Sequence, residues 1–295
     1  LLPHWIPQAQ FAGFYMALEK GFYEREGIAL TLLRGGPDYP AGPLLENGEA
    51  TFASMFLSQA LEFRDQGVPV MNIAQIMQRS ALMLVARKSS GIAGPKDLDG
   101  RKVSIWENFR AQPLALFNKL GIKPIILPQT STLNLFLRGG VDAASAMWYN
   151  EYHTLINSGI NEDEMVVMFY DDYGLNFPED GLYCLKKTLE GNRELCCRFT
   201  QATVDGWEYA FAHTGETLGV VMRYAEEAHT GTNWAHQRWM LARMQDLIHP
   251  PGNTEPTGHL NADDFYVAAE ELKRCNVIRT IPALEDFHVA CVPEN

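Results

Sequence analysis

The sequence is short of the features that mark metal-binding, disulfide-rich and membrane-spanning proteins. Its five cysteines include no Cys-x-x-Cys pair, so neither a zinc site nor a disulfide framework is expected. Adjacent Cys196 and Cys197 are interpreted as small apolar helix residues. The eight histidines lack metal-ligand spacing. No stretch approaches the ~20 uninterrupted apolar residues of a membrane span, because even 73–85 is broken by polar side chains.

Motifs for nucleotide-driven and nucleophilic chemistry are missing as well. Neither a P-loop nor a Gly-x-Gly-x-x-Gly turn is present, and no Gly-x-Ser-x-Gly elbow marks a nucleophile. The formal net charge is −12 at pH 7, and the basic clusters are short and scattered, which argues against a nucleic-acid partner. We therefore expect no catalytic residue, no metal and no cofactor.

What remains is the pattern of an α/β protein with two lobes. The 295 residues exceed a usual single core, and 46% of them are hydrophobic. Strands alternate with helices, which is typical of mostly parallel sheets covered on both faces, and the last third is mainly helical. The expected helices cover 8–22, 58–66, 111–120, 133–137 and 233–248, with another from 262, and the expected strands cover 28–33, 50–55, 68–76, 101–106, 124–127, 141–147 and 182–186.

Aromatic and amide side chains gather just after the expected strands. Because ligands of open α/β sheets lie outside the carboxyl ends of the strands, these side chains are candidate ligand contacts. Aromatic walls with amides and a carboxylate suit a flat heteroaromatic ligand. The alternative is that the large rings belong to the core and that Asn150 and Glu151 cap the start of a helix. The candidates are Trp5, Gln8, Gln10, Phe56, Ser80, Trp106, Asn108, Trp148, Tyr149, Asn150 and Glu151.

Two further candidates, Glu179 and Asp180, follow Pro178 in an expected loop. Two adjacent carboxylates can meet a ligand amino group, or act against each other as general acid and base. The alternative is a solvated turn. The sequence alone leaves these interpretations open.

Several short segments between Trp5 and about Phe211 are specific in combination. Two of them follow the patterns A-x-x-K-G-[FY]-[FY]-x-x-x-G-[IL] and D-L-x-G-[RK]-[KR]-V. The segments are Trp5-Ile-Pro, 17–28, 48–53, 67–70, 97–103 and 139–143. Together they resemble the NMT1/THI5-like group of periplasmic solute-binding proteins.

The resemblance implies a periplasmic-binding-protein type II fold that closes on its ligand. Lobe 1 would comprise 1–84 and 175–295, and lobe 2 would comprise 85–174, with hinges near 82–88 and 170–178. Members of the family bind thiamine pyrimidine precursors, riboflavin-like molecules or other small organic solutes for import. The ligand would lie between the two lobes.

A eukaryotic branch of the same family makes the thiamine pyrimidine from pyridoxal phosphate and its own histidine. Where that synthase pattern has a cofactor lysine and a donor histidine, this sequence has Met55 and Gln59. The resemblance therefore implies that this chain does not perform that chemistry.

We expect a non-catalytic binding protein for a neutral or cationic heteroaromatic solute, with an ABC-transporter permease as its partner. It would be periplasmic or extracytoplasmic, anchored or targeted by a segment before Leu1 that the sequence does not include. One alternative is the sensor segment of a membrane receptor such as a histidine kinase. Another is a pyrimidine-forming enzyme that depends on Glu179 and Asp180.

Overall fold

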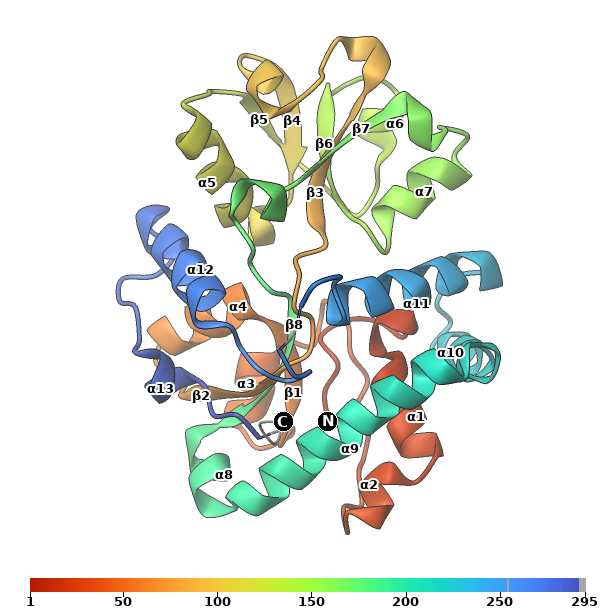
Figure 1. The fold of residues 1–295 in the computed structure, drawn as a ribbon, viewed down its shortest axis with the longest axis vertical. Helices are drawn as coiled ribbons and strands as arrows, with labels where there is room; N and C mark the ends of the chain where they lie inside the picture. The colour runs from red at the N-terminus through yellow and green to blue at the C-terminus, as the bar shows by residue number, and fades with distance from the viewer. Residues whose placement is uncertain (254, 292–295) are drawn as a thin grey trace.

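Two β-sheets, one above the other in Figure 1, organise the chain. The computed structural model describes residues 1–253 and 255–291. We call the part built on the three-stranded sheet lobe 1 and the part built on the five-stranded sheet, residues 82–169, lobe 2. The first sheet has the order β1-β8-β2, with β1 at Ala53–Phe56, β2 at Val70–Gln75 and β8 at Asp180–Leu185. The second has the order β5-β4-β6-β3-β7, with β3 at Leu82–Arg87, β4 at Lys102–Ile105, β5 at Ile125–Pro128, β6 at Ala143–Met147 and β7 at Met165–Phe169.

Helices cover both sheets, and most of them belong to lobe 1. Those of lobe 1 are α1 (Ala12–Glu19), α2 (Phe22–Arg25), α3 (Ala41–Glu46), α4 (Leu57–Asp65), α8 (Lys186–Gly191), α9 (Arg193–Ala212), α10 (Thr214–Glu227), α11 (Trp234–Ile248), α12 (Ala262–Arg274) and α13 (Leu284–Phe287). Those of lobe 2 are α5 (Ala111–Leu120), α6 (Asn134–Leu137) and α7 (Glu151–Asn157). Short 3-10 turns lie at η1 (Ala9–Phe11), η2 (Lys88–Ser90), η3 (Pro95–Leu98), η4 (Glu107–Phe109), η5 (Glu162–Glu164) and η6 (Asp171–Tyr173).

The α/β fold is confirmed, but the expectation of mostly parallel sheets is wrong in detail. Strand β8 pairs antiparallel with both β1 and β2, and β3 pairs antiparallel with both β6 and β7. The parallel pairs in the described sheets are β4 with β5 and β4 with β6. The reason is that β3 and β8 each follow a crossing between the lobes. A strand that arrives without a crossover helix is free to run against its neighbours.

The chain crosses between the sheets twice, over residues 76–81 and over residues 170–179. In Figure 1 both crossings run through the middle of the molecule. The hinge expected near 82–88 is misplaced, because 82–87 form β3, a strand with a partner on each side. The run of apolar residues in this region continues from one sheet into the other, which is why its pattern does not mark the boundary.

Two glycines set how closely the helices of lobe 1 approach the start of the chain. A Cβ on Gly206 of α9 would lie 2.2 Å from the carbonyl oxygen of Gly13, and a Cβ on Gly13 of α1 would lie 2.4 Å from the Trp207 ring. Side chains at these positions would push α1 away from α9, because such distances are far below van der Waals contact. This close packing fixes η1 and the residues just before it, where several site candidates lie.

The expectation that no disulfide forms is wrong. A disulfide joins Cys197 of α9 to Cys291, across a sequence separation of 94 residues, with the two Cα atoms 4.4 Å apart. Spacing in the sequence cannot reveal such a pair, because the fold brings the two residues together. Cys196 is a buried helix residue, as expected. Across 1–253 and 255–291, no helix is long and apolar enough to cross a membrane.

Candidate functional site

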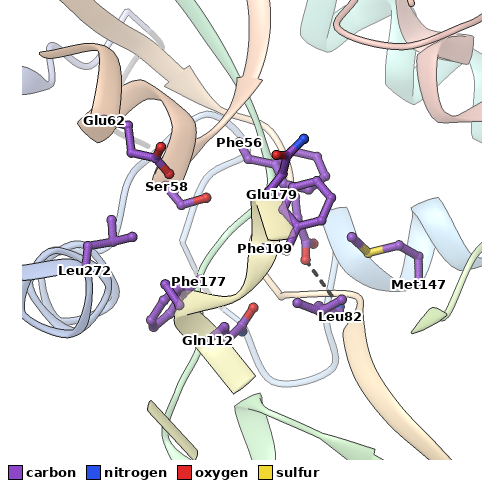
Figure 2. A pocket seen from close by; sticks show the side chains of 12 residues that line it. Phe56, Ser58, Glu62, Leu82, Phe109, Gln112, Met147, Phe177, Glu179 and Leu272 are labelled. Atoms are coloured by element: carbon purple, nitrogen blue, oxygen red, sulfur yellow. Dashed lines mark hydrogen bonds between the residues drawn. The ribbon is translucent and has the colours of Figure 1, made fainter. Parts of the chain in front are cut away.

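A pocket lies between the two lobes, beside both crossings (Figure 2). In this arrangement of the lobes its cavity volume is about 20 Å³, enough for about one water molecule. Lobe 1 and the crossings contribute Phe56, Ser58, Glu62, Phe177, Glu179 and Leu272, and lobe 2 contributes Leu82, Asn108, Phe109, Ala111, Gln112 and Met147. Because the walls come from both lobes, a ligand held here would contact each of them.

One aromatic ring from each lobe meets at this pocket. The Phe56 ring, at the end of β1, lies 5.0 Å from the Phe109 ring of η4, measured between centroids, with a tilt of 31°. The His4 ring approaches the edge of Phe56 at 5.1 Å. Figure 2 shows the two phenyl rings next to Glu179. They give the pocket an apolar wall suited to the face of a flat ring.

Glu179 ties the second crossing to the first. Its carboxylate accepts hydrogen bonds from the Ser80 hydroxyl at 2.7 Å, from the Ala81 N–H at 2.7 Å and from the Leu82 N–H at 3.2 Å. The solvated turn is therefore wrong, because Glu179 is only 2% exposed and Asp180 only 3%. Burial raises the pKa of Glu179 to about 7, against the opposing effect of these hydrogen bonds.

A second buried polar cluster surrounds Asp180 in lobe 1. Gln10 donates from Nε2 to both carboxylate oxygens of Asp180, at 3.1 and 3.0 Å, and accepts from Gln8 at 2.5 Å. His4 lies 3.5 Å from Asp180 and 2.9 Å from the Ser54 hydroxyl. Burial lowers the pKa of His4 to about 3 and raises that of Asp180, so His4 is neutral and the contact is not an ion pair.

Residues 148–151 reach the same region from lobe 2. Tyr149 is 3% exposed, and its pKa is raised by burial and by the carboxylates of Asp180, Glu179 and Glu151. Glu151 accepts hydrogen bonds from the Met147 N–H and from the Asn150 side chain, each at 3.0 Å, and burial raises its pKa to about 7. The carboxylates at 151, 179 and 180 thus share one electrostatic environment.

The structure places the predicted site residues in three groups. Phe56, Asn108 and Glu179 line the pocket. The polar network beside it contains Gln8, Gln10, Ser80, Tyr149, Asn150, Glu151 and Asp180. The three tryptophans lie outside the lining: Trp5 is 37% exposed, Trp106 donates to the Thr130 carbonyl, and Trp148 packs against α11.

The sequence reasoning missed several residues that line the pocket. Gln112 lies inside α5, and Leu272 inside α12, so no strand end points to them. Gln112 also donates to the Ser80 hydroxyl at 3.1 Å and to the Leu175 carbonyl at 2.7 Å. Met147 ends β6, and the strand-end rule applied one residue earlier would have found it.

The charge of the pocket limits what it can hold. Its twelve lining residues include two carboxylates, Glu62 and Glu179, and no lysine or arginine. Burial also raises the pKa of Glu62. Carboxylates accept hydrogen bonds and repel anions, so the pocket suits a ligand with N–H donors. No cluster of three potential metal ligands occurs over 1–253 and 255–291.

Comparisons with known proteins give one family and several relatives. The family described as NMT1/THI5 like matches residues 8–217. The riboflavin-binding protein RibY of Chloroflexus aurantiacus is 25% identical over 245 residues, which cover 77% of this chain and 66% of that protein. A formylaminopyrimidine-binding protein of Halalkalibacterium halodurans is 21% identical over 243 residues, covering 76% of this chain and 69% of that protein.

Two further comparisons concern an enzyme and a solved structure. The 4-amino-5-hydroxymethyl-2-methylpyrimidine phosphate synthase of Schizosaccharomyces pombe is 24% identical over 124 residues, covering 42% of this chain and 36% of the synthase. The crystal structure of the periplasmic aliphatic sulphonate binding protein SsuA from Escherichia coli matches with a TM-score of 0.71 at 15% identity. That match covers 97% of this chain and 90% of SsuA. At this identity it establishes the fold alone.

Proposed function

Because this chain belongs to the NMT1/THI5-like family, we propose that it is a non-catalytic, extracytoplasmic solute-binding protein. Its ligand is a small heteroaromatic molecule that carries N–H donors, of the pyrimidine type. The two lobes close on this ligand, and an ABC-transporter permease receives it. Closure is the event that a partner reads, because it changes the surface that the two lobes present together.

One observation carries the ligand class: the pocket combines an aromatic wall with carboxylates and lacks a cationic side chain in its lining. The Phe56 and Phe109 rings offer apolar contact to a flat ring, and Glu62 and Glu179 favour a hydrogen-bond donor at its edge. An anion would face the two carboxylates of the lining with no compensating positive charge there, which is unfavourable.

The names of two relatives agree with this class of ligand. One is a riboflavin-binding protein and the other a formylaminopyrimidine-binding protein, and both ligands contain a nitrogen heterocycle. The fold-level match to SsuA, by contrast, carries no information about ligand charge at 15% identity. We therefore infer the nitrogen heterocycle of the ligand from the names of these two relatives. The preference against an anionic ligand is inferred from the charged residues that line the pocket.

Isothermal titration calorimetry of the purified chain tests the proposal. The probes are formylaminopyrimidine, 4-amino-5-hydroxymethyl-2-methylpyrimidine, its phosphate, riboflavin and an aliphatic sulfonate. We expect at least one uncharged ring to bind, and the phosphate and the sulfonate to bind much more weakly or not at all. Preferential binding of the sulfonate, or binding of none of the rings, would contradict the proposed function.

A pair of variants links such binding to the pocket. Phe109→Ala removes one aromatic wall and is expected to weaken binding about tenfold or more, from the ~1–3 kcal/mol typical of an aromatic contact. Tyr39→Ala is the matched control, because Tyr39 is an exposed aromatic residue that does not line the pocket. Equal affinities for Phe109→Ala and the wild type would place the ligand elsewhere.

The enzymatic alternative is less well supported. It requires Glu179 and Asp180 to exchange protons with a substrate, whereas the Glu179 carboxylate is engaged by Ser80 and by two backbone N–H groups. Met55 and Gln59 also stand where the synthase pattern has lysine and histidine. Turnover of pyridoxal phosphate by the purified chain, lost in Glu179→Gln, would favour the enzyme. The sensor alternative depends on sequence beyond this chain and stays a prediction.

A further inference from the structure

Beside the first crossing, where the Trp148 N–H donates to the Ala81 carbonyl, the two lobes meet a second time, with α7 of lobe 2 over α11 of lobe 1 (Figure 1). His236 of α11 places its Nε2 atom 2.9 Å from the Asn150 Oδ1 atom and its Nδ1 atom 2.9 Å from the Nδ1 atom of His153. Trp239 donates from Nε1 to the Trp148 carbonyl at 2.9 Å. We call these contacts of Trp148, Asn150 and His153 with His236 and Trp239 the clasp.

The helix that carries the lobe 1 half of the clasp also touches the site and a crossing. Near its start, the Gln237 side chain accepts a hydrogen bond from the Ala9 N–H at 2.6 Å, between Gln8 and Gln10 of the polar cluster. At its end, the Leu247 carbonyl accepts from the N–H groups of Gln78 and Arg79, in the first crossing. Helix α11 is therefore fixed to lobe 1 and to the first crossing, so forming or breaking the clasp changes the position of lobe 2 relative to lobe 1.

We propose that the clasp favours the closed over the open arrangement of the lobes at neutral pH and loses this effect in acid, through the paired imidazoles of His153 and His236. The release of ligand that follows from this opening rests on the proposed function. The opening itself does not, because it can be measured on the ligand-free chain. The residues of the clasp act as positioning residues, since none of them lines the pocket.

The argument starts from hydrogen-bond geometry. Two Nδ1 atoms 2.9 Å apart share one hydrogen, so one ring donates and the other accepts. His236 then donates from Nε2 to Asn150, whose amide donates to Glu151. The pair accommodates at most one extra proton. When both rings are imidazolium ions, two N–H groups and two positive charges face each other, and the contact breaks.

The surroundings of the pair agree with this direction. Burial lowers the pKa of both rings, and the charge of His153 lowers that of His236 further. From α7, Glu151 reaches the pair only through Asn150. From α11, Arg243 stands two turns beyond His236, over the Trp148 and Trp239 rings at 4.7 Å from each centroid, and is paired with Asp246. Because Asp246 compensates Arg243, the positive charge that each ring would face on protonation is the other imidazolium, which disfavours a second proton on the pair.

The sign follows from linkage. A histidine whose pKa is lower in the closed state than in the open state stabilises the closed state above about pH 6.5, its ordinary pKa, and this stabilisation is lost as the pH falls. A shift of one pKa unit corresponds to about a tenfold change in the closing equilibrium. Closure is therefore expected to weaken between pH 7.5 and pH 5, by about tenfold for each unit by which the pKa differs between the closed and open states.

Small-angle X-ray scattering of the ligand-free chain at pH 7.5 and at the lowest pH that keeps its far-ultraviolet circular dichroism tests the clasp. The wild type is expected to have a larger radius of gyration in acid than at pH 7.5. His236→Gln keeps a donor and an acceptor but does not titrate, so its radius of gyration is expected to be the same at both pH values. His249→Gln is the matched control, because His249 follows the end of α11 and contacts Glu208 and Thr257 instead of lobe 2.

Two results would overturn the proposal: a wild type with the same radius of gyration at both pH values, or a His236→Gln variant that expands as the wild type does. Where one of the pyrimidine or flavin probes binds, its affinity for the wild type should fall about tenfold or more in acid, and less than twofold for His236→Gln. A merely structural contact would shift affinity equally at every pH. If no probe binds, the proposed function fails, and the scattering still decides the clasp.

Discussion

The two lobes are joined in two places that differ in chemistry. At the crossings, side chains bond mainly to backbone: Glu179 accepts from Ala81 and Leu82, and Asn176 accepts from the Ser80 N–H at 2.8 Å and donates to the Gln78 carbonyl at 2.9 Å. At the clasp, buried and half-buried side chains bond mainly to one another, and two of them are histidines whose pKa is lowered by burial.

This difference teaches which junction is permanent and which can open. Backbone partners are held by the chain itself, and a buried donor that loses its acceptor costs about 1–3 kcal/mol, so the crossing should keep its bonds in every state. Side-chain partners near the surface can exchange each other for water at little cost. We therefore infer that the crossing is the pivot and that the clasp is the contact that forms and breaks.

The largest effect is expected from removing the Glu179 carboxylate. Glu179→Ala leaves the Ser80 hydroxyl and two buried N–H groups without their acceptor, so the free energy of unfolding at pH 5 should fall by about 3–5 kcal/mol. Asn150→Ala, at the clasp, should cost less than about 1 kcal/mol. Urea unfolding measures both, and equal losses would remove the distinction between the junctions.

The pH dependence of the two junctions should have opposite signs. The pKa of Glu179 is raised from 4.5 to about 7 in the folded chain, so its contribution to stability is largest in acid and falls as the pH rises from about 4.5 to about 7. The free energy of unfolding of Glu179→Gln should therefore rise relative to that of the wild type, by on the order of 3 kcal/mol over this pH interval. Closure at the clasp should strengthen over the same interval. Urea unfolding at a series of pH values measures this. A difference in unfolding free energy between Glu179→Gln and the wild type that does not change with pH would contradict the raised pKa of Glu179.

A smaller loss of unfolding free energy is expected from replacing Gln112, which joins α5 of lobe 2 to both crossings. Gln112→Met keeps the volume but removes the donor to Ser80 and to the Leu175 carbonyl, at a cost of about 1–3 kcal/mol in unfolding free energy. Gln201→Met, on α9, is the control, because Gln201 is only partly buried and bonds to Asp205 on the same helix. Chemical denaturation compares the two, and a neutral Gln112→Met would show that the crossing tolerates an unpaired carbonyl.

The smallest effect concerns the clasp alone. Trp239→Phe keeps an aromatic ring beside His153 but loses the bond to the Trp148 carbonyl, which is worth about 1 kcal/mol. The pH at which the lobes open should rise by less than one unit, as followed by scattering. Trp234→Phe, an exposed residue at the start of the same helix, should leave it unchanged. Identical opening curves for both variants would show that this bond does not contribute.

Local pattern was enough to predict most elements of the fold. The helix expected over 111–120 has those bounds in α5, and that expected over 233–248 becomes α11. Residues 28–33 do not form an assigned strand, although Leu33 donates to the Leu1 carbonyl. Periodicity reports burial on one face, whereas strand assignment also needs a partner with continuous hydrogen bonds.

The candidate site was only partly accessible to the same reasoning. The strand-end rule found Phe56 and Asn108, which line the pocket, because that rule follows from sheet geometry, whereas Glu179 was found as one of two adjacent carboxylates in an expected loop. It could not find Leu272 or the disulfide partner Cys291, since both depend on how the last third of the chain folds back on the first. The tryptophans misled it, because size and polarity do not tell which way a side chain points.

The strand order of lobe 1 has a consequence for how the chain assembles during its synthesis. Strand β8 lies between β1 and β2, yet it is made after all of residues 82–169. Lobe 2 is one continuous stretch and can finish folding as soon as it leaves the ribosome. The edges of β1 and β2 that pair with β8 stay unpaired until Asp180–Leu185 has been synthesised. The sheet of lobe 1, which begins earlier in the chain, is therefore completed after that of lobe 2.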